Sequence, residues 1–301
     1  MNAGADETIE VAFDQPMAVG ECPVWNAAEG CLYWVDIDGF AVHRLIPSSG
    51  AHRSWPMDSE PSALALAPGS GLVVALRSGF AHLDTGSGKL TPIAPAPFDP
   101  ATTRFNDGRV DPAGRFWVGT MFEPRTPPVA EMYCLERGSV RRVWSGGMTV
   151  SNGLAFSPDG RWMYHADTTS HRIDRYPFDA ATGAVADAQP FHRFSDDKAA
   201  ADYGGRPDGA AVDSEGAYWC AMFEGGRLLR FAADGTLLRE VKLPLRCPTM
   251  IAFGGEDLRT LYITSAGRKR SDAERAQYPL SGCVLSLRVD VAGLPEPHYQ
   301  P

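Results

Sequence analysis

An internal repeat constrains the fold of this chain more than any other feature of its sequence. Short apolar runs recur, each broken by a small polar turn and followed by a second run rich in Trp, Tyr, Val and Leu. The turns Pro-Ala-Gly, Pro-Asp-Gly and Ser-Glu-Gly mark three of the copies. Six such pairs of runs begin at Pro23, Ala63, Gly108, Leu154, Ala210 and Ile251. A repeat of this kind indicates that one supersecondary unit is used several times.

The repeating unit contains more than one hairpin. After each pair of runs comes another segment with strand character that ends in a turn, such as VHRLIPSSG from Val42 and RLLRFAADG from Arg227. The unit recurs about every 40 to 55 residues, which is the size of a four-stranded propeller blade. We therefore predict an all-β, six-bladed β-propeller with four antiparallel strands per blade, formed by residues 1–301 as a single domain. A solenoid is the competing architecture, but solenoids stack more uniform units.

The N-terminal run TIEVAFDQ, residues 8–15, alternates apolar and polar residues and has no hairpin partner of its own. We expect it to join the last blade as an outer strand and to close the ring, because closure removes an exposed sheet edge. The alternative is a frayed tail.

Composition narrows the possible partners. A net charge of −9 argues against a nucleic-acid or anionic-membrane surface, since both need a basic field, and it favours a small-molecule partner. The 6 cysteines show neither a C-x-x-C motif nor zinc spacing, so free thiols are expected. The acidic N-terminus does not match a signal peptide, and no apolar run reaches the roughly 20 residues that span a bilayer. These features predict a cytoplasmic protein.

One position of the repeat carries a side-chain oxygen in all six copies. These residues are Glu21, Ser62, Asn106, Asn152, Asp208 and Thr249. Equivalent positions in a propeller face the common axis, so we expect the side chains to converge at one mouth of the channel. Crowded carboxylates repel each other, and a hard divalent ion with oxygen ligands relieves that conflict. A metal site is therefore predicted; the alternative is that each residue caps its own strand or turn.

Such a site suits hydrolysis. A carboxylate-held cation with open coordination positions polarises a carbonyl and orients a water. Asp208 is the candidate general base, because a carboxylate beside that water can accept its proton. Arg104 lies two residues before Asn106 and is a candidate for binding a substrate oxygen, with a loop salt bridge as the alternative.

The segments that carry these residues resemble the regucalcin/gluconolactonase family of six-bladed propeller sugar lactonases. The resemblance covers nearly the whole chain in family order and includes GECPVW from Gly20, RFNDGRVDPAGRFWVGTM from Arg104, SNGLAFSPDGRWMYHADT from Ser151 and RPDGAAVDSEGAYW from Arg206. The chain departs from the family pattern at Cys22, where the family has a small residue beside the metal ligand.

The resemblance implies a site and a reaction. One divalent cation would be held by Glu21, Asn152 and Asp208, with Asp208 also serving as general base, while Asn106 and Arg104 would contact the substrate. The implied reaction is hydrolytic opening of an aldonolactone to its sugar acid. All-oxygen ligation favours Ca²⁺, Mg²⁺ or Mn²⁺, although Zn²⁺ or Fe²⁺ can occupy such a site.

Two irregular segments are candidates for substrate selection. Residues 122–131 are Pro-rich and include Glu123, which is expected to accept a sugar hydroxyl. Residues 194–207 are expected to form a lid with Tyr203 reaching inward. Long loops with little secondary structure often carry function, though many are tolerated insertions. The run GRKRSDAERAQ from Gly267 is interpreted as a solvated helical turn or loop.

Two other function classes remain open on the sequence alone: a calcium-binding protein without turnover and a propeller that serves as a protein-interaction scaffold. No G-x-S-x-G, G-x-G-x-x-G or Walker motif is present, which argues against serine hydrolases, dinucleotide-binding folds and P-loop proteins. The particular sugar, the metal and the oligomeric state are not readable from the sequence.

Overall fold

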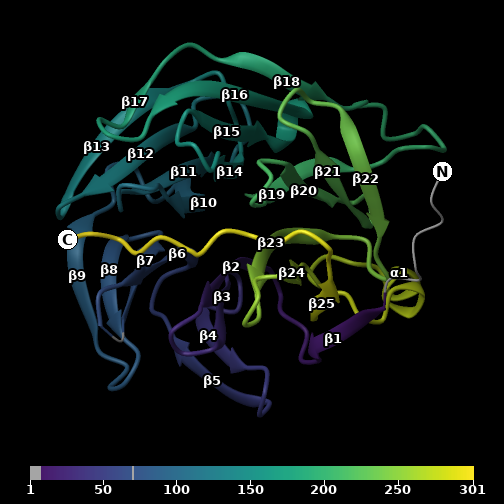
Figure 1. The fold of residues 1–301 in the computed structure, drawn as a ribbon, viewed down its shortest axis with the longest axis horizontal. Helices are drawn as coiled ribbons and strands as arrows, with labels where there is room; N and C mark the ends of the chain where they lie inside the picture. The colour runs from purple at the N-terminus through teal and green to yellow at the C-terminus, as the bar shows by residue number, and fades with distance from the viewer. Residues whose placement is uncertain (1–7, 70) are drawn as a thin grey trace.

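The computed structural model describes residues 8–69 and 71–301, which form six antiparallel sheets around a central axis (Figure 1). In five of the sheets the chain starts at the axis and moves outward strand by strand, and in the sixth the outermost strand is the N-terminal one. The predicted all-β, six-bladed propeller is therefore confirmed. Within the described ranges, the helices are one short α-helix, α1 (Asp272–Gln277), and one 3-10 turn, η1 (Thr168–Ser170). Neither is long and apolar enough to cross a membrane.

The first three blades contain four strands each. Blade 1 consists of β2 (Gly20–Asn26), β3 (Cys31–Asp36), β4 (Ala41–Ile46) and β5 (Ala51–Pro56). Blade 2 consists of β6 (Pro61–Ala67), β7 (Gly71–Leu76), β8 (Gly79–Asp84) and β9 (Leu90–Pro95). Blade 3 consists of β10 (Thr103–Val110), β11 (Phe116–Phe122), β12 (Glu131–Glu136) and β13 (Ser139–Ser145).

The fourth blade differs because its outer edge is divided between two short strands. Blade 4 consists of β14 (Ser151–Phe156), β15 (Trp162–Asp167), β16 (Arg172–Asp179), β17 (Ala184–Val185) and β18 (Gln189–Arg193). Blade 5 consists of β19 (Arg206–Val212), β20 (Tyr218–Phe223), β21 (Arg227–Phe231) and β22 (Leu237–Lys242). Blade 6 consists of β23 (Pro248–Gly254), β24 (Thr260–Ser265), β25 (Val284–Arg288) and β1 (Ile9–Phe13).

The two ends of the chain meet in blade 6. Strand β1 pairs antiparallel with β25, with Ile9 opposite Leu287 and Val11 opposite Leu285. The predicted closure of the ring by the N-terminal strand is confirmed, with the strand spanning five residues. Residues 1–7, where the sequence shows no signal-peptide pattern, lie outside the described part of the chain.

In two of the repeated turns an aspartate side chain holds the turn in place by hydrogen bonds. Asp111 accepts hydrogen bonds from two amides of its own turn and from the Trp117 indole at 2.8 Å. Asp213 does the same in blade 5 and bonds the Trp219 indole at 2.9 Å. Each carboxylate thus fixes both the turn and a large aromatic side chain that is buried in the core.

A β-bulge interrupts every inner strand where that strand pairs with its neighbour. The register shifts lie at Glu21/Val24, Pro61/Ala63, Phe105/Gly108, Asn152/Ala155, Pro207/Ala210 and Pro248/Ile251. A bulge bends the strand and changes the direction of the side chains beside it. Each bulge adjoins or contains one of the six oxygen-bearing positions predicted to face the channel.

The C-terminal segment covers the end of the channel opposite those bulges (Figure 1). The Tyr299 amide donates to the Leu66 carbonyl at 2.7 Å, and the Gln300 amide donates to the carbonyl of Gly114 at 2.9 Å. Arg109, which is partly buried in the channel wall, forms a 3.0 Å ion pair with Glu296 of this segment. The channel therefore has its open mouth at the starts of the inner strands.

Candidate active site

A cavity of about 270 Å³ lies at the open mouth of the channel and is lined by five of the six blades. Its wall contains Glu21, Asn106, Asn152, Asp208 and Thr249. The structure thus brings together five of the six oxygen-bearing residues that the repeat aligns. Ser62 does not line the cavity; it is 1% exposed, and its hydroxyl has no hydrogen-bond partner among the described residues.

Three blades are connected through side-chain amides at the cavity floor. Asn106 Nδ2 donates to Asn152 Oδ1 at 2.7 Å, and Asn152 Nδ2 donates to Asp208 Oδ1 at 2.5 Å. The same Asn152 nitrogen donates to Thr168 Oγ1 at 2.7 Å. Thr168 in turn donates to the Pro207 carbonyl at 2.7 Å, next to Asp208. All of these side chains are buried, so the floor is a hydrogen-bonded and geometrically defined surface.

The two carboxylates of the cavity are destabilised in their charged forms. Burial raises the pKa of Glu21 well above its usual value, and the negative charge of Asp208 raises it further. Burial also raises the pKa of Asp208, and the nearby charge of Asp107 adds to the effect. Carboxylates with raised pKa values gain stability from a bound cation, because the cation favours their ionised forms.

The donor set at this floor fits a hard divalent cation. Two buried carboxylates and the Asn152 amide supply oxygen ligands of the kind that Ca²⁺ and Mg²⁺ take. Among the described residues no group of three or more His, Cys, Asp and Glu side chains is placed to hold a metal ion, so the amide is needed as a third protein ligand. Its nitrogen faces Asp208 in the structure, and a half-turn of the amide would present the oxygen to that position instead.

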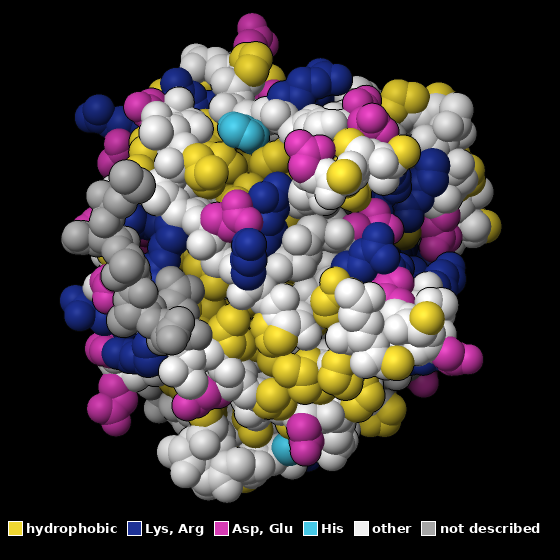
Figure 2. All heavy atoms as spheres, turned by 90° about the vertical axis from the view of Figure 1, so that its right-hand side faces the viewer, with side chains coloured by type: hydrophobic (Ala, Val, Ile, Leu, Met, Phe, Trp, Pro, Cys, Tyr) yellow, Lys and Arg dark blue, Asp and Glu magenta, His cyan; other side chains and the backbone are white. Residues whose placement is uncertain are grey.

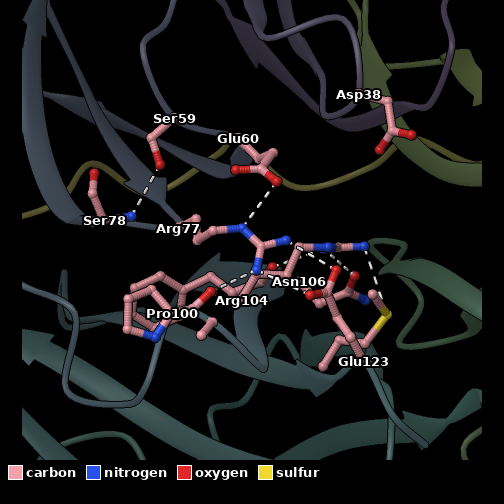
Figure 3. Close-up of polar contacts among 12 residues, drawn as sticks. Asp38, Ser59, Glu60, Arg77, Ser78, Pro100, Arg104, Asn106 and Glu123 are labelled. Carbon is pink, nitrogen blue, oxygen red and sulfur yellow. Dashed lines mark hydrogen bonds and ion pairs between the residues drawn. The ribbon is translucent and has the colours of Figure 1, made fainter.

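Arg104 lies beside the amide network rather than in a loop salt bridge. Its Nη1 donates to Asn106 Oδ1 at 2.7 Å and to the Phe105 carbonyl at 2.8 Å, and its Nη2 contacts the Met121 sulfur at 3.6 Å (Figure 3). Arg104 is 6% exposed, and burial lowers its pKa to about 10. The guanidinium therefore presents a fixed, largely desolvated positive charge to the cavity.

Glu123 lies outside the cavity wall, at the rim (Figure 3). Its two carboxylate oxygens accept from the Arg77 guanidinium at 2.9 and 3.0 Å, and Arg77 also contacts Glu60 at 2.9 Å. Arg77 lowers the pKa of Glu123, and Glu123 is the strongest favourable charge acting on Arg104. Glu123 therefore affects the cavity indirectly, because its negative charge stabilises the positive charge of Arg104.

Several residues of the site were missed by the sequence analysis. The largest group is cationic and lines the cavity: Arg125, Arg206, Arg268, Lys269 and Arg270. The run GRKRSDAERAQ from Gly267 is predicted to be a solvated helical turn or loop; its residues 268–270 line the cavity just before α1. Its only sequence signal was the density of positive charge in Arg-Lys-Arg. Arg125 and Arg206 belong to the two irregular segments, whereas Tyr203 does not line the cavity.

Asp107 is a second omission, although it directly follows Asn106. It is 3% exposed, its Oδ2 accepts from the Leu154 amide at 2.9 Å, and burial raises its pKa to about 6. Its Oδ1 has no hydrogen-bond partner among the described residues. Asp107 therefore places a third buried carboxylate close enough to perturb both Glu21 and Asp208.

Cys22, which departs from the family pattern, has a structural role next to Glu21. Its φ of 45° lies in the left-handed region, its amide donates to Glu21 Oε2 at 3.1 Å, and its thiol accepts from the Leu64 amide at 3.1 Å. Burial raises the pKa of the thiol far above its usual value. The residue thus orients Glu21 through its backbone, and its sulfur is an uncharged packing group.

The fold and the cavity define a six-bladed propeller with a polar, oxygen-rich site at one mouth of its channel. Residues 19–267 match the family model described as the SMP-30/Gluconolactonase/LRE-like region, and the chain belongs to this family. The 6-deoxy-6-sulfogluconolactonase of Pseudomonas putida is 47% identical over 98% of this chain and 99% of its own length. The pentonolactonase of Haloferax volcanii is 32% identical over 96% and 97% of the two chains.

A solved structure supports the same conclusion. The calcium-binding protein regucalcin of Agrobacterium tumefaciens superposes with a TM-score of 0.92 and 31% sequence identity, covering 98% of each chain. The resemblance stated from the sequence motifs is therefore confirmed at the level of family and fold.

Proposed function

We propose that this chain hydrolyses a sugar lactone to the free sugar acid, with one divalent cation bound by Glu21, Asn152 and Asp208. The protein is a lactonase by its family and its full-length relatives. The observation that carries the proposed mechanism is the convergence of two buried carboxylates, two carboxamides and an arginine on one cavity.

The proposed chemistry assigns a task to each side chain. A bound divalent cation supplies Lewis-acid polarisation of the ester carbonyl. Asp208 accepts a proton from the water that attacks this carbonyl, because its carboxylate faces the cavity and is held by Asn152. The ester C–O bond then breaks, and the ring oxygen leaves as a hydroxyl after receiving from Asp208 the proton that this carboxylate took from the water. Arg104 and Asn106 hold substrate oxygens during these steps.

The cavity also limits the substrate. The channel is closed at its far end by the C-terminal segment, so a substrate enters and leaves the cavity by the open mouth. A volume of about 270 Å³ suits a single monosaccharide lactone rather than an oligosaccharide. Because one relative is named a 6-deoxy-6-sulfogluconolactonase and another a pentonolactonase, the first substrates to offer are hexono- and pentonolactones with and without a charged substituent.

A lactone panel with several metals tests the proposal. We expect acid release that is lost on chelation and restored by at least one of Ca²⁺, Mg²⁺, Mn²⁺, Zn²⁺ and Fe²⁺. Asp208→Asn should lower kcat by about 10²- to 10⁴-fold. Ser62→Ala is the matched control, because Ser62 is the repeat-equivalent residue that does not line the cavity, and we expect it to retain activity within a few-fold. Equal activity of wild type and Asp208→Asn on every lactone would refute the assignment.

Calcium binding without turnover is the second candidate, and the regucalcin neighbour described as calcium-binding favours it. It predicts a stoichiometric cation at Glu21, Asn152 and Asp208 with no acid release from any lactone. The same panel therefore separates the two candidates. A propeller used purely as an interaction scaffold predicts neither a bound cation nor turnover.

A further inference from the structure

The cavity is basic although the protein is acidic. Six cationic side chains line it, against the two carboxylates of Glu21 and Asp208, while the whole chain has 28 Lys and Arg against 37 Asp and Glu. Figure 2 shows one side of the ring, where charges of both signs are interspersed with hydrophobic patches. Positive charge is therefore concentrated at the cavity far beyond the average of the chain.

We propose that the cavity recognises a sugar lactone that carries a strongly acidic substituent, and that Arg125, Arg206 and Lys269 bind this group. The inference rests on the proposed lactonase function and narrows its substrate class. The substituent is an oxyanion such as a sulfonate or a phosphate, attached to the sugar away from the ester carbonyl.

Among the described residues, only some of the cations that line the cavity form ion pairs with carboxylates of the protein, and this supports binding of an anionic ligand. Arg206 is paired with Glu224 at 3.0 Å, Arg270 with Glu274 at 3.3 Å, and Arg268 with Asp38. The other three cations of the wall, which are Arg104, Arg125 and Lys269, have no carboxylate within ion-pair distance among the described residues. Partial burial and then the nearby charge of Arg206 lower the pKa of Arg125, so these two cations repel each other.

The wall is also held in place. Two guanidinium groups contact the Phe223 ring, with the Arg206 Cζ at 5.3 Å and the Arg270 Cζ at 5.9 Å from its centroid. Cation–π contacts of this kind fix a guanidinium without neutralising it. The Arg206 Nε is buried and has no hydrogen-bond partner among the described residues. An orphaned donor at a cavity wall is costly unless a ligand satisfies it.

The two loop cations without an ion-pair partner in the described part of the chain, Arg125 and Lys269, both have an unusual backbone conformation. Arg125 has a φ of 69° and Lys269 a φ of 55°, both in the left-handed region that residues other than glycine rarely occupy. Strained residues of this type cluster at ligand-binding positions, where the surrounding structure maintains them. Both loops thus direct a cation toward the cavity at some cost in backbone energy.

Hydrogen-bond chemistry distinguishes an anion from plain sugar hydroxyls. Arginine and lysine side chains donate hydrogen bonds and accept none, whereas a sugar hydroxyl needs partners of both kinds. Arg125, Arg206 and Lys269 supply donors only, which matches a group that only accepts, such as a sulfonate or an ionised phosphate. Arginine and lysine are also the residues that bind such oxyanions most strongly, through charge-assisted hydrogen bonds.

Matched lactones test the inference. We would measure kcat/KM for gluconolactone, its 6-phosphate and its 6-deoxy-6-sulfo derivative at several ionic strengths. We expect at least one anionic lactone to exceed the neutral one by 10-fold or more, with an advantage that shrinks as salt screens the charges. Arg125→Gln and Lys269→Gln should each reduce kcat/KM at least 10-fold more for the anionic than for the neutral lactone. The ranking of sulfonate and phosphate identifies the preferred group.

Arg161→Gln is the matched control, because Arg161 is 81% exposed and lies in the distant β14–β15 turn. It should leave the ratio of anionic to neutral kcat/KM unchanged. Equal kcat/KM for neutral and anionic lactones in wild type would overturn the inference.

A binding experiment separates this inference from the proposed reaction. Calorimetric titration with 6-deoxy-6-sulfogluconate and with gluconate measures recognition without turnover. We expect tighter binding of the sulfonated acid, and a loss of that preference in Arg125→Gln and Lys269→Gln. If no lactone is hydrolysed but the preference persists, the reaction is wrong and the anion site stands. If lactones are hydrolysed and neither acid is preferred, the anion site is wrong.

Discussion

Asn152 donates a 2.5 Å hydrogen bond to Asp208, and this contact joins the fourth blade to the fifth at the channel mouth. Its amide oxygen accepts from Asn106 of the third blade at 2.7 Å. One buried side chain therefore couples three blades at the place where the proposed cation and base meet. Its replacement should affect metal binding before it affects the fold.

For this reason we expect Asn152→Ala to weaken the affinity for the activating cation by about 10- to 100-fold, since the variant removes one ligand and frees Asp208. Metal titration by calorimetry and the metal concentration for half-maximal activity should shift together. An unchanged affinity would show that Asn152 is not a ligand. The thermal midpoint of the apo-protein serves as the control for folding.

Glu123 and Glu60 form a natural pair of test positions, because both carboxylates contact Arg77 while only Glu123 acts strongly on Arg104. We expect Glu123→Gln to raise the KM for the lactone a few-fold and Glu60→Gln to leave it nearly unchanged. Steady-state kinetics on one substrate compares them directly. Equal KM values for the two variants would remove Glu123 from the substrate-binding residues.

The buried turn carboxylate of blade 5 should contribute to stability. Asp213 is fully buried and accepts from Trp219 at 2.9 Å and from Arg230 at 2.8 Å. Asp213→Asn should lower the free energy of unfolding by about 2–3 kcal/mol, because it leaves the arginine with a weaker partner. Asp159→Asn, in the exposed turn of blade 4, should cost less than about 1 kcal/mol in urea denaturation. Similar losses at both positions would contradict this explanation.

Mild acid should destabilise blade 1 through His43. Burial, and then the neighbouring His52, lower the pKa of His43 from 6.5 to about 4. The unfolded chain therefore binds a proton that the folded chain does not bind between these pH values, and stability falls as the pH drops below about 6.5. From pH 7 to pH 5 this one group should cost about 2 kcal/mol.

His43→Phe tests that explanation, because phenylalanine can keep the stacking on Trp34, whose ring lies 5.2 Å away, and it cannot be protonated. Urea denaturation at pH 7 and pH 5 should show a smaller loss for the variant than for wild type. Parallel losses would assign the acid sensitivity to other groups.

The repeat made the architecture accessible from sequence, because each blade buries similar side chains and uses a similar turn. For the same reason the alignment of Glu21, Asn106, Asn152 and Asp208 predicted that these residues line one cavity, which the structure confirms. The resemblance added their proposed roles. The metal and the general base remain predictions.

The basic wall was not predictable in the same way. Arg125 and Lys269 lie in the loops between the second and third strands of blades 3 and 6, which are longer than the corresponding loops of the other blades. Both residues have left-handed backbone angles that strand periodicity does not encode. Segment 122–131 reaches the cavity, as the sequence predicts, but through Arg125 rather than through Glu123. Which of two charged neighbours faces a cavity depends on loop geometry, and tertiary contacts determine that geometry.

The bulge in every inner strand separates the residue at the channel mouth from the residues that keep the sheet together. Hydrogen bonding on both sides of each bulge keeps the sheet register, so the residue at the mouth is free to change its chemical type without rebuilding the blade. A Glu, two Asn and an Asp already occupy such places in four otherwise similar strands. We therefore expect a change of substrate to require substitutions at a few mouth positions rather than in the interior packing.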